Sequence, residues 1–531
     1  MPMTFGKTFL GAILRRFENA AGTRLLSLGM RFRLRHRVGR FNAARRLVVD
    51  YAQKMRESHA LLARLREEFP ETGRRTDLLS LAEADRRAAI LRGCIRAAAG
   101  LSSQQTENET IDELWAEVAF LTRHARDLKP YFEALRARRV LYAGQSYYHN
   151  WYLSRALRKL GWRADVLNWD PDPGSQVFYH GEDIHFTGDT PYDLARDLGY
   201  YLKSLYHYDL VHFANAHGIR FSSPLRVYFE RRRGAGAEIH LLRQLGKKIC
   251  YTNNGCLDGV LQSSFAKWGP DSVCAICPWR GVDTICSDWR NRVWGEFRNE
   301  VTDYQCLLGG NRADFNLAPT VHETPEAYCL DKDIWDPGLQ IPDRLRLEPV
   351  SKGTIRLYHA VGNREARTRK DGINIKSTHV YLPLIEKLRS EGYHLDLISP
   401  NNVPNKDVRF LQMQADIVLE MLTFGWFGAN VREAMMLGKP VVCYIRPEWL
   451  DSLRAEIPAY ADELPIISAT PDTVEAVLRD LIGNPEKCKE IGRKSREFAI
   501  KWHSKEAAAH RFDTIYSELL QGSPLLVERY V

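Results

Sequence analysis

The segment from Ala415 to Tyr444 is the most informative part of the chain, and it reads ADIVLEMLTFGWFGANVREAMMLGKPVVCY. Two short apolar runs, one near the start of the segment and one from Pro440 onward, have the length and composition of buried strands. A glycine-containing loop and a stretch of helical composition separate them. This order of strand, loop, helix and strand indicates a parallel sheet covered by helices.

The loop and the start of the expected helix have the features of a ligand site. Gly425 and Gly428 allow a ligand to approach the backbone closely. Backbone amides near Ala429 and Asn430 can receive a diphosphate, because they begin a helix. One turn further on, Glu433 can accept hydrogen bonds from ribose hydroxyls. A purely structural strand, loop and helix without a ligand fits the same pattern.

The alternation of strand and helix occupies most of the chain after residue 138. Apolar runs predict two groups of strands, Val140–Gly144, Ala164–Leu167, Asp209–Phe213 and Lys248–Thr252, then Ile355–Ala360, His394–Ser399, Ile417–Leu419 and Pro440–Tyr444. A linker rich in Pro, Asp and Gly, residues 331–353, separates them. We therefore expect an α/β protein with two Rossmann-like domains facing a ligand cleft. The expected boundaries are a basic α-helical extension at 1–137, a first domain at 138–345 and a second at 346–531.

Three short motifs stand in the order and spacing of a known family: Phe427-Gly428, Glu433-Ala434-Met435 and Gly438-Lys439-Pro440-Val441. They resemble the C-terminal signature of retaining GT-B glycosyltransferases of family four, in a bacterial branch that assembles surface glycans. The resemblance covers residues 355–520 well and 139–330 loosely. It implies a GT-B fold whose first domain binds the acceptor. It also implies that the second domain binds a nucleotide-diphosphate sugar through Gly425, Trp426, Phe427, Gly428, Ala429, Asn430 and Glu433.

The chain departs from the family at one position. The family has a first glutamate eight residues before the second, and that carboxylate contacts the donor sugar. This chain has Gly425 there. We expect Glu420 or a backbone group near Trp426 to replace the carboxylate; if neither does, catalysis is impaired.

The resemblance also implies an arginine and a lysine on the loop after the first strand of the second domain. We assign Arg364 and Lys376. Cations are needed here because departure of the leaving group places negative charge on the phosphate oxygens. Arg367, Arg369 and Lys370 compete for the same role, and solvated surface charge is the alternative for each.

In the first domain, three strand ends are expected to face the cleft. Gly144 ends one strand, His217 follows a second, and Asp258 follows a third. Asp258 can orient an acceptor hydroxyl, and His217 lies where the family often has a histidine. Each of these two fits equally well as a satisfied polar residue at a strand end. A retaining enzyme of this type needs no strong general base, because the departing phosphate can take the proton.

Four cysteines lie within 31 residues: Cys256, Cys274, Cys277 and Cys286. A Cys-x-x-Cys pair with two outlying cysteines fits a structural tetrathiolate zinc site in a cytosolic protein. The other two cysteines lack that spacing, so buried or free thiols fit as well, and disulfides are a third alternative. We expect no cofactor for catalysis.

The positive charge of the chain is concentrated at its start. Residues 1–50 hold eleven basic residues against two acidic ones, which accounts for the whole net charge of +9. Within this stretch, one helical face collects Phe5, Phe9, Leu10, Ile13, Leu14 and Phe17. We expect residues 1–40 to bind an anionic membrane surface. A helix packed on the body, with its arginines in solvent, is the alternative. The neutral remainder argues against specific nucleic-acid binding.

No apolar run approaches the ~18 residues that a membrane-spanning helix needs. The chain also starts without the apolar core and cleavage site of an export signal. We therefore expect a cytoplasmic protein, peripheral at the inner face of the membrane. The predicted function is a hexosyltransferase that transfers a sugar, with retention, from a nucleotide-diphosphate sugar to a glycan or lipid-linked acceptor. A GT-B-fold nucleotide-sugar epimerase and a non-catalytic sugar-nucleotide-binding assembly subunit are the alternatives.

Overall fold

The structure is a computed structural model, and it describes residues 138–522 apart from gaps at 145–146, 169–179, 187–200, 202–203, 205–207, 215–217, 223–224, 228, 231–234, 245, 254–258, 269–271, 278, 283–285, 308–311, 363 and 370. The predicted extension, 1–137, lies outside these residues, and so does the arm at 1–40. By its internal contacts the chain divides into two compact units. The larger unit comprises 138–185, 209–219 and everything from 247 onward, and it contains both β-sheets.

The described part of the smaller unit falls within 186–208 and 220–246. It includes helix α8 (Ala237–Gln244). The Tyr201 hydroxyl donates a 2.7 Å hydrogen bond to the Glu238 carbonyl, and the rings of Phe221 and Phe229 pack edge-on against the Tyr201 ring. None of the described residues assigned to the predicted site belongs to this unit.

The first sheet of the larger unit is parallel and has seven strands in the order β3-β2-β1-β4-β5-β6-β7. Its strands are β1 (Arg139–Ala143), β2 (Arg163–Asn168), β3 (Ile184–His185), β4 (Leu210–Phe213), β5 (Lys248–Thr252), β6 (Tyr304–Leu307) and β7 (Val321–Glu323). All residues of β1 and β4 are buried, as expected for parallel strands covered on both faces. The strand order reverses between β1 and β4, and this place is called the first switch point below. Ligands of such sheets bind at the carboxyl ends of the strands that flank a switch point.

The second sheet is also parallel and has four strands in the order β11-β10-β8-β9. Its strands are β8 (Ile355–Tyr358), β9 (Leu395–Ile398), β10 (Ile417–Leu419) and β11 (Val441–Val442). The order reverses between β8 and β10, so the carboxyl ends of these two strands flank the second switch point. The expectation of an α/β fold with two parallel sheets is confirmed. Below, each sheet with its helices is called the first half or the second half.

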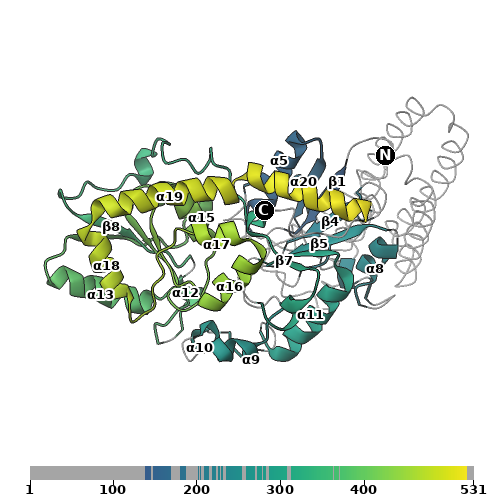
Figure 1. The fold of residues 1–531 in the computed structure, drawn as a ribbon, viewed down its shortest axis with the longest axis horizontal. Helices are drawn as coiled ribbons and strands as arrows, with labels where there is room; N and C mark the ends of the chain where they lie inside the picture. Colours follow the sequence, from purple (N-terminus) through teal and green to yellow (C-terminus); the bar gives the residue numbers. More distant parts are fainter. Residues whose placement is uncertain are drawn as a thin grey trace, which may run out of the picture. The chain divides into compact units, whose positions relative to one another are not determined.

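Helices connect the strands in both halves (Figure 1). In the first half, α5 (His149–Lys159) follows β1, and α11 (Asp288–Val301) precedes β6. The second half contains α12 (Arg364–Arg367), α13 (Thr378–Ser390), α14 (Asn405–Gln412), α15 (Ala429–Met436), α16 (Pro447–Glu456), α17 (Pro458–Glu463), α18 (Val474–Gly483) and α19 (Pro485–His503). Among the described residues, no helix is long and apolar enough to cross a membrane.

The last helix, α20 (Lys505–Gln521), returns the chain from the second half to the first. Helix α19 contacts α15 of the second half, whereas α20 contacts α5 of the first half. The Tyr516 hydroxyl on α20 lies 3.0 Å from the Tyr142 hydroxyl on β1 and 2.5 Å from His212 Nδ1 on β4. These contacts tie the end of the chain to the centre of the first sheet.

The two places where the chain passes between the halves lie side by side. The amide of Leu330, where the chain leaves the first half, donates a 2.7 Å hydrogen bond to the carbonyl of His503. The amide of Lys505, where the chain returns, donates a 2.8 Å bond to the carbonyl of Leu330. The side chains of Lys505 and Asp331 add an ion pair at the same place. The two crossings therefore form one bonded unit.

Candidate functional site

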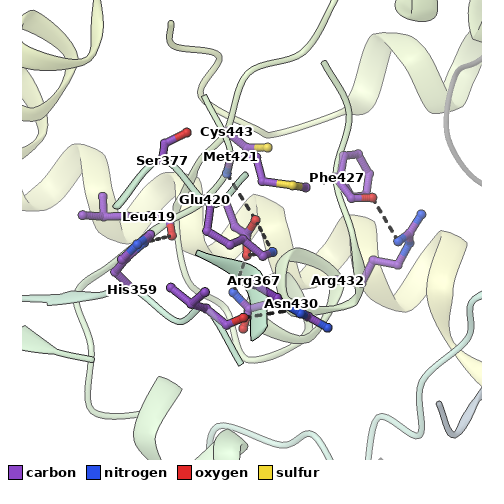
Figure 2. Close-up of polar contacts among 12 residues, drawn as sticks. His359, Arg367, Ser377, Leu419, Glu420, Met421, Phe427, Asn430, Arg432 and Cys443 are labelled. Carbon is purple, nitrogen blue, oxygen red and sulfur yellow. Dashed lines mark hydrogen bonds and ion pairs between the residues drawn. The ribbon is translucent and has the colours of Figure 1, made fainter. Parts of the chain in front are cut away.

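Glu420 lies at the centre of the switch point of the second sheet. It directly follows β10, and none of its surface is exposed. Lys376 Nζ lies 2.7 Å from its Oε1 and 2.8 Å from its Oε2, and Asn430 Nδ2 donates a 2.8 Å bond to Oε1. Figure 2 shows the Glu420 carboxylate between Met421 and Asn430. One buried carboxylate thus binds a cation from the loop before α13 and a side chain from the first turn of α15.

The loop that presents Lys376 is held rigidly by its own side chains. Asn374 Oδ1 accepts hydrogen bonds from the amides of Lys376 (3.0 Å) and Thr378 (3.3 Å). Ser377 has a φ of +61°, in the left-handed region, and its buried hydroxyl accepts a 3.0 Å bond from the Leu422 amide. Because a serine in that region is strained, the surrounding bonds must stabilise it. The position of Lys376 is therefore well defined.

A buried histidine joins the ends of β8 and β10. His359 Nδ1 lies 3.1 Å from the carbonyl oxygen of Leu419, and its Nε2 lies 2.8 Å from the Thr378 hydroxyl. Burial lowers the pKa of His359 to about 4, so the ring is neutral at neutral pH. The contact with Leu419 is visible in Figure 2. His359 thus fixes the two strand ends that flank the switch point.

The start of α15 is open to a ligand. Gly428 is the N-cap residue in an extended conformation, and its own side chain, a hydrogen atom, cannot cap the helix. A Cβ atom placed on Gly428 would meet no atom of the described residues within 4 Å, so these residues leave space beside it. Because Ala429 and Asn430 begin the helix, their amides have no partner within the helix and can receive an anion. This is the place at which the sequence predicts the diphosphate.

The aromatic residues of the same loop lie in the core. Trp426 and Phe427 are both buried, and the Phe427 ring packs edge-on against the Trp449 ring with centroids 5.7 Å apart. The Phe427 carbonyl accepts a 3.2 Å bond from Arg432 Nη1, as Figure 2 shows. Any contact of Trp426 or Phe427 with a donor would therefore come from the backbone. Their side chains stabilise the loop.

The backbone explains the glycine at position 425. Gly425 has a φ of +91°, a conformation that residues with a side chain rarely adopt. A Cβ atom at this position would lie 2.9 Å from Arg446 Cβ and 3.1 Å from Arg446 Nη1. The Arg446 amide also donates a 2.8 Å bond to the Gly425 carbonyl. A glutamate does not fit at 425 in this structure, and Glu420, five residues earlier, is the nearby buried carboxylate.

Arg364 is the first residue of α12, and it contacts residues that follow β9, whereas Lys376 binds Glu420, which follows β10. Its Nη2 donates a 2.7 Å bond to the Ser399 hydroxyl, and its amide donates a 3.1 Å bond to Asn401 Oδ1. Two of its competitors are engaged elsewhere. Arg367 Nη1 donates to the Val361 carbonyl at 3.2 Å, and Arg369 pairs with Asp371 at 2.8 Å. Lys370 lies outside the described residues.

Glu433 lies on α15 as predicted, but its carboxylate faces the first half. Oε1 accepts a 2.5 Å bond from the Tyr148 hydroxyl and a 2.9 Å bond from Asn405 Nδ2. The residue is 2% exposed. Burial raises its pKa to about 7, although the bonds from Tyr148 and Asn405 oppose the rise. Asn405 Oδ1 in turn lies 2.8 Å from His180 Nε2.

The sequence analysis did not identify Tyr148 and Asn405. Tyr148 lies four residues beyond Gly144, in an uncharged run of polar and aromatic residues, which is a weak signal of a binding loop. Asn405 gave no signal at all, because it is one polar residue in a polar stretch. Only the fold brings both residues to Glu433.

Of the site residues predicted in the first half, only Gly144 is described. It follows β1 with a φ of +82°, and its carbonyl accepts a 3.0 Å bond from Asn150 Nδ2. Its position at the carboxyl end of β1 is the first switch point. His217 and Asp258 lie outside the described residues, at positions that follow β4 and β5.

Three of the four clustered cysteines are described, and each is present as a free thiol. Burial raises the pKa of Cys274 to about 12, and it also raises the pKa values of Cys277 and Cys286. Cys286 Sγ accepts a 2.7 Å bond from Gln262 Nε2. Within the described part of the chain, no three His, Cys, Asp or Glu side chains are arranged to hold a metal ion. The predicted zinc site therefore depends on Cys256, which lies outside the described residues.

Comparison with known proteins gives likenesses of structure only. No protein-family model matches the sequence, and no curated protein matches it significantly. Sucrose-phosphate synthase from Thermosynechococcus elongatus has 13% identity and a TM-score of 0.44, over 73% of this chain and 100% of that chain. The catalytic domain of starch synthase IV from Arabidopsis thaliana, bound to ADP and acarbose, has 12% identity and a TM-score of 0.43, over 72% of this chain and 99% of that chain. UDP-N-acetylglucosamine 2-epimerase from Rickettsia bellii has 12% identity and a TM-score of 0.36, over 73% of this chain and 97% of that chain. All three TM-scores are below 0.5, so the description of the fold rests on the sheets and helices of this chain.

Proposed function

We propose that this protein is a glycosyltransferase that moves a hexose-type sugar, with retention, from a nucleotide-diphosphate sugar to a glycan or lipid-linked acceptor. One observation carries the proposal. At the switch point of the second sheet, the open start of α15 lies within one hydrogen-bonded side-chain network with Lys376, through Asn430 and Glu420. A helix start and a fixed cation both favour binding of a diphosphate.

The proposed chemistry follows from these groups. The amides of Ala429 and Asn430 bind the diphosphate, and Lys376 and Arg364 stabilise the negative charge that grows as the sugar leaves. Groups that bind this charge more strongly in the transition state than in the ground state accelerate the reaction. The backbone of residues 425–428 lies against the donor. These assignments follow the family resemblance of the motif.

Glu433 is the proposed partner of the ribose hydroxyls. Its carboxylate accepts the bonds from Tyr148 and Asn405 on Oε1, and Oε2 keeps acceptor capacity for a ribose hydroxyl. In the first half, Gly144, His217 and Asp258 are the proposed acceptor-side residues. The anionic membrane surface that residues 1–40 are proposed to bind would bring the enzyme to a lipid-linked acceptor at the inner face of the membrane.

A panel of nucleotide sugars tests the function. Purified protein is incubated with UDP-glucose, ADP-glucose, GDP-mannose and dTDP-glucose, and the released nucleoside diphosphate and the sugar products are measured. Slow release of nucleoside diphosphate from one donor supports a transferase, and an acceptor should accelerate it. A new sugar isomer would instead indicate an epimerase, and binding without turnover would indicate an assembly subunit. Protein that neither binds nor converts any of the four would refute the proposal.

Lysine 376 allows a sharper version of this test. Lys376→Met should lower kcat for the active donor more than it lowers donor affinity, because the charge it binds grows in the transition state. Arg369→Met is the matched control, since Arg369 already pairs with Asp371. Equal losses of kcat in the two variants would show that Lys376 is not the phosphate cation.

A further inference from the structure

We infer that Glu420 is the positioning residue of the donor site: it holds Lys376 and the start of α15 in the arrangement that a departing diphosphate needs. This inference rests on the proposed function, because it assigns a role within the same site. Glu420 acts through its neighbours and does not contact the donor.

The first argument is that the Glu420 carboxylate has no free capacity. Its Oε1 accepts bonds from Lys376 Nζ (2.7 Å) and Asn430 Nδ2 (2.8 Å). Its Oε2 accepts bonds from Lys376 Nζ (2.8 Å) and from the Met421 amide (3.2 Å). A carboxylate offers about four acceptor positions, and four bonds use them. With none of its surface exposed, Glu420 has nothing left for a sugar hydroxyl.

The second argument concerns what the carboxylate joins. Lys376 precedes α13, and Asn430 is the second residue of α15, so the two approach the site from different connections of the sheet. Asn430 Oδ1 also accepts a 2.7 Å bond from Gln412 Nε2 at the end of α14. Glu420 therefore ends a line of bonds that links α14, α15 and the Lys376 loop. Fixing reacting groups in this way is a large source of catalytic rate.

The third argument is that Lys376 keeps a donor for the substrate. An ammonium group has three N–H donors, and among the described residues Lys376 uses two of them on Glu420. The side chain is 12% exposed, whereas that of Glu420 is fully buried. The geometry thus leaves one N–H of Lys376 for a phosphate oxygen.

The fourth argument is that position 425 cannot carry this carboxylate. The φ of +91° at Gly425 and the guanidinium of Arg446 against it exclude a side chain there. A buried carboxylate directly after β10 therefore provides the negative charge. The Glu420 carboxylate has a different role from the first glutamate of the family, because at position 420 it binds Lys376 and not the donor sugar.

The inference predicts that removing the charge of Glu420 lowers turnover without weakening the binding of a nucleoside diphosphate. Glu420→Gln keeps the size of the side chain but removes the charge that compensates Lys376. The ammonium is then more strongly attracted to a bound nucleoside diphosphate, yet it is no longer held in place. We expect the dissociation constant of the diphosphate to stay within threefold or to decrease. We expect kcat to fall at least tenfold, which corresponds to about 1.4 kcal/mol of barrier.

The experiment compares the full-length wild type with Glu420→Gln, Glu420→Asp and the control Glu323→Gln. Glu323 is a buried glutamate on edge strand β7 of the first sheet and pairs with Arg312 at 3.5 Å, away from the second switch point. Binding of UDP, ADP, GDP and dTDP is measured by calorimetry, and turnover is measured with the sugar that the wild type converts. Glu420→Asp retains the charge and should recover part of kcat. Lys376→Met and the double variant with Glu420→Gln should have the same kcat, because the glutamate acts through the lysine.

Two outcomes would overturn the inference. One is a Glu420→Gln variant that loses diphosphate affinity and thermal stability along with kcat, because that is the behaviour of a merely structural residue. The other is a kcat no lower than that of Glu323→Gln. A wild type that neither binds any of the four diphosphates nor converts any of the four sugars refutes the proposed function itself, and the inference falls with it. The wild-type result and the variant results therefore separate the two failures.

Discussion

The buried carboxylate of Glu433 should make the stability of this protein depend on pH in a way that one substitution removes. Burial raises the pKa of Glu433 from an ordinary 4.5 to about 7. Below pH 4.5 the carboxyl is protonated in both the folded and the unfolded chain, and it costs nothing. Between pH 4.5 and 7 the unfolded chain releases the proton while the folded chain retains it, so the free energy of unfolding falls as the pH rises. Above pH 7 the full cost is present.

The size of this cost follows from the pKa difference. The difference between 4.5 and about 7, at about 1.4 kcal/mol for each tenfold change in the proton-binding constant, corresponds to about 3 kcal/mol. Glu433→Gln has the shape of the protonated form, so its oxygen can still accept from Tyr148 and Asn405. The variant should therefore be more stable than the wild type at pH 8.5 and close to it at pH 5. At about 2 °C per kcal/mol for a large domain, we expect a difference of roughly 6 °C.

Thermal unfolding of both proteins at pH 5 and pH 8.5 measures the effect. Burial also raises the pKa values of Glu238 and Glu323 to about 7, so these residues add to the pH dependence of stability in both proteins. The difference between the variant and the wild type isolates the contribution of Glu433. Tyr148→Phe should make the protein less stable than the wild type at pH 8.5, since it removes a hydrogen bond that favours the charged carboxylate of Glu433. A stability difference between Glu433→Gln and wild type that is the same at both pH values would refute the reasoning.

Three further predictions concern other parts of the chain. Gly425→Ala should destabilise the protein by about 1 to 3 kcal/mol, because the positive φ of Gly425 and the contact with Arg446 leave no room for a methyl group. A melting temperature equal to that of the wild type would contradict this. If Cys256 completes a zinc site with Cys274, Cys277 and Cys286, protein purified without chelator should hold about one zinc per chain, and Cys274→Ser should lower its stability. Well-folded protein without zinc would rule the site out. Deleting residues 1–40 should release the protein from anionic vesicles, since each cation near the surface contributes about 1 kcal/mol, and binding of the full chain that does not weaken with salt would contradict an electrostatic anchor.

The strands of the second sheet could be predicted because they are short apolar runs ending in glycine or polar residues. The segment 415–444 contains β10, α15 and β11 in the expected order. Strands β6 and β7 were not predicted. Their sequences, YQCL and VHE, are short and contain polar residues, and only burial in the assembled sheet makes them strands.

The candidate site could be predicted in its position but not in its contacts. Lys376 is assigned from the family resemblance, and Glu420 is one of two expected replacements for the first glutamate of the family. The bond between Tyr148 and Glu433 could not be predicted, because the two residues are 285 positions apart in the chain and meet only after both halves have folded. The contrast between Arg364, with its side chain on Ser399, and Arg369, which pairs with Asp371, is likewise a result of the fold.

The paired crossings at Leu330 and at His503–Lys505 have a mechanical consequence. The two backbone segments that cross between the halves are hydrogen-bonded to each other. A turn of one half against the other that keeps these bonds has to take place about a single line through the crossings. The bond between Tyr148 and Glu433 and the 2.9 Å bond from the Glu323 amide to the Glu456 carboxylate on α16 join the two halves at other points, so both oppose a turn about that line. A crosslink between Tyr148 and Glu433 would therefore restrict such a turn, whereas one between Leu330 and Ser504, which lie on the line itself, would add no restriction of its own.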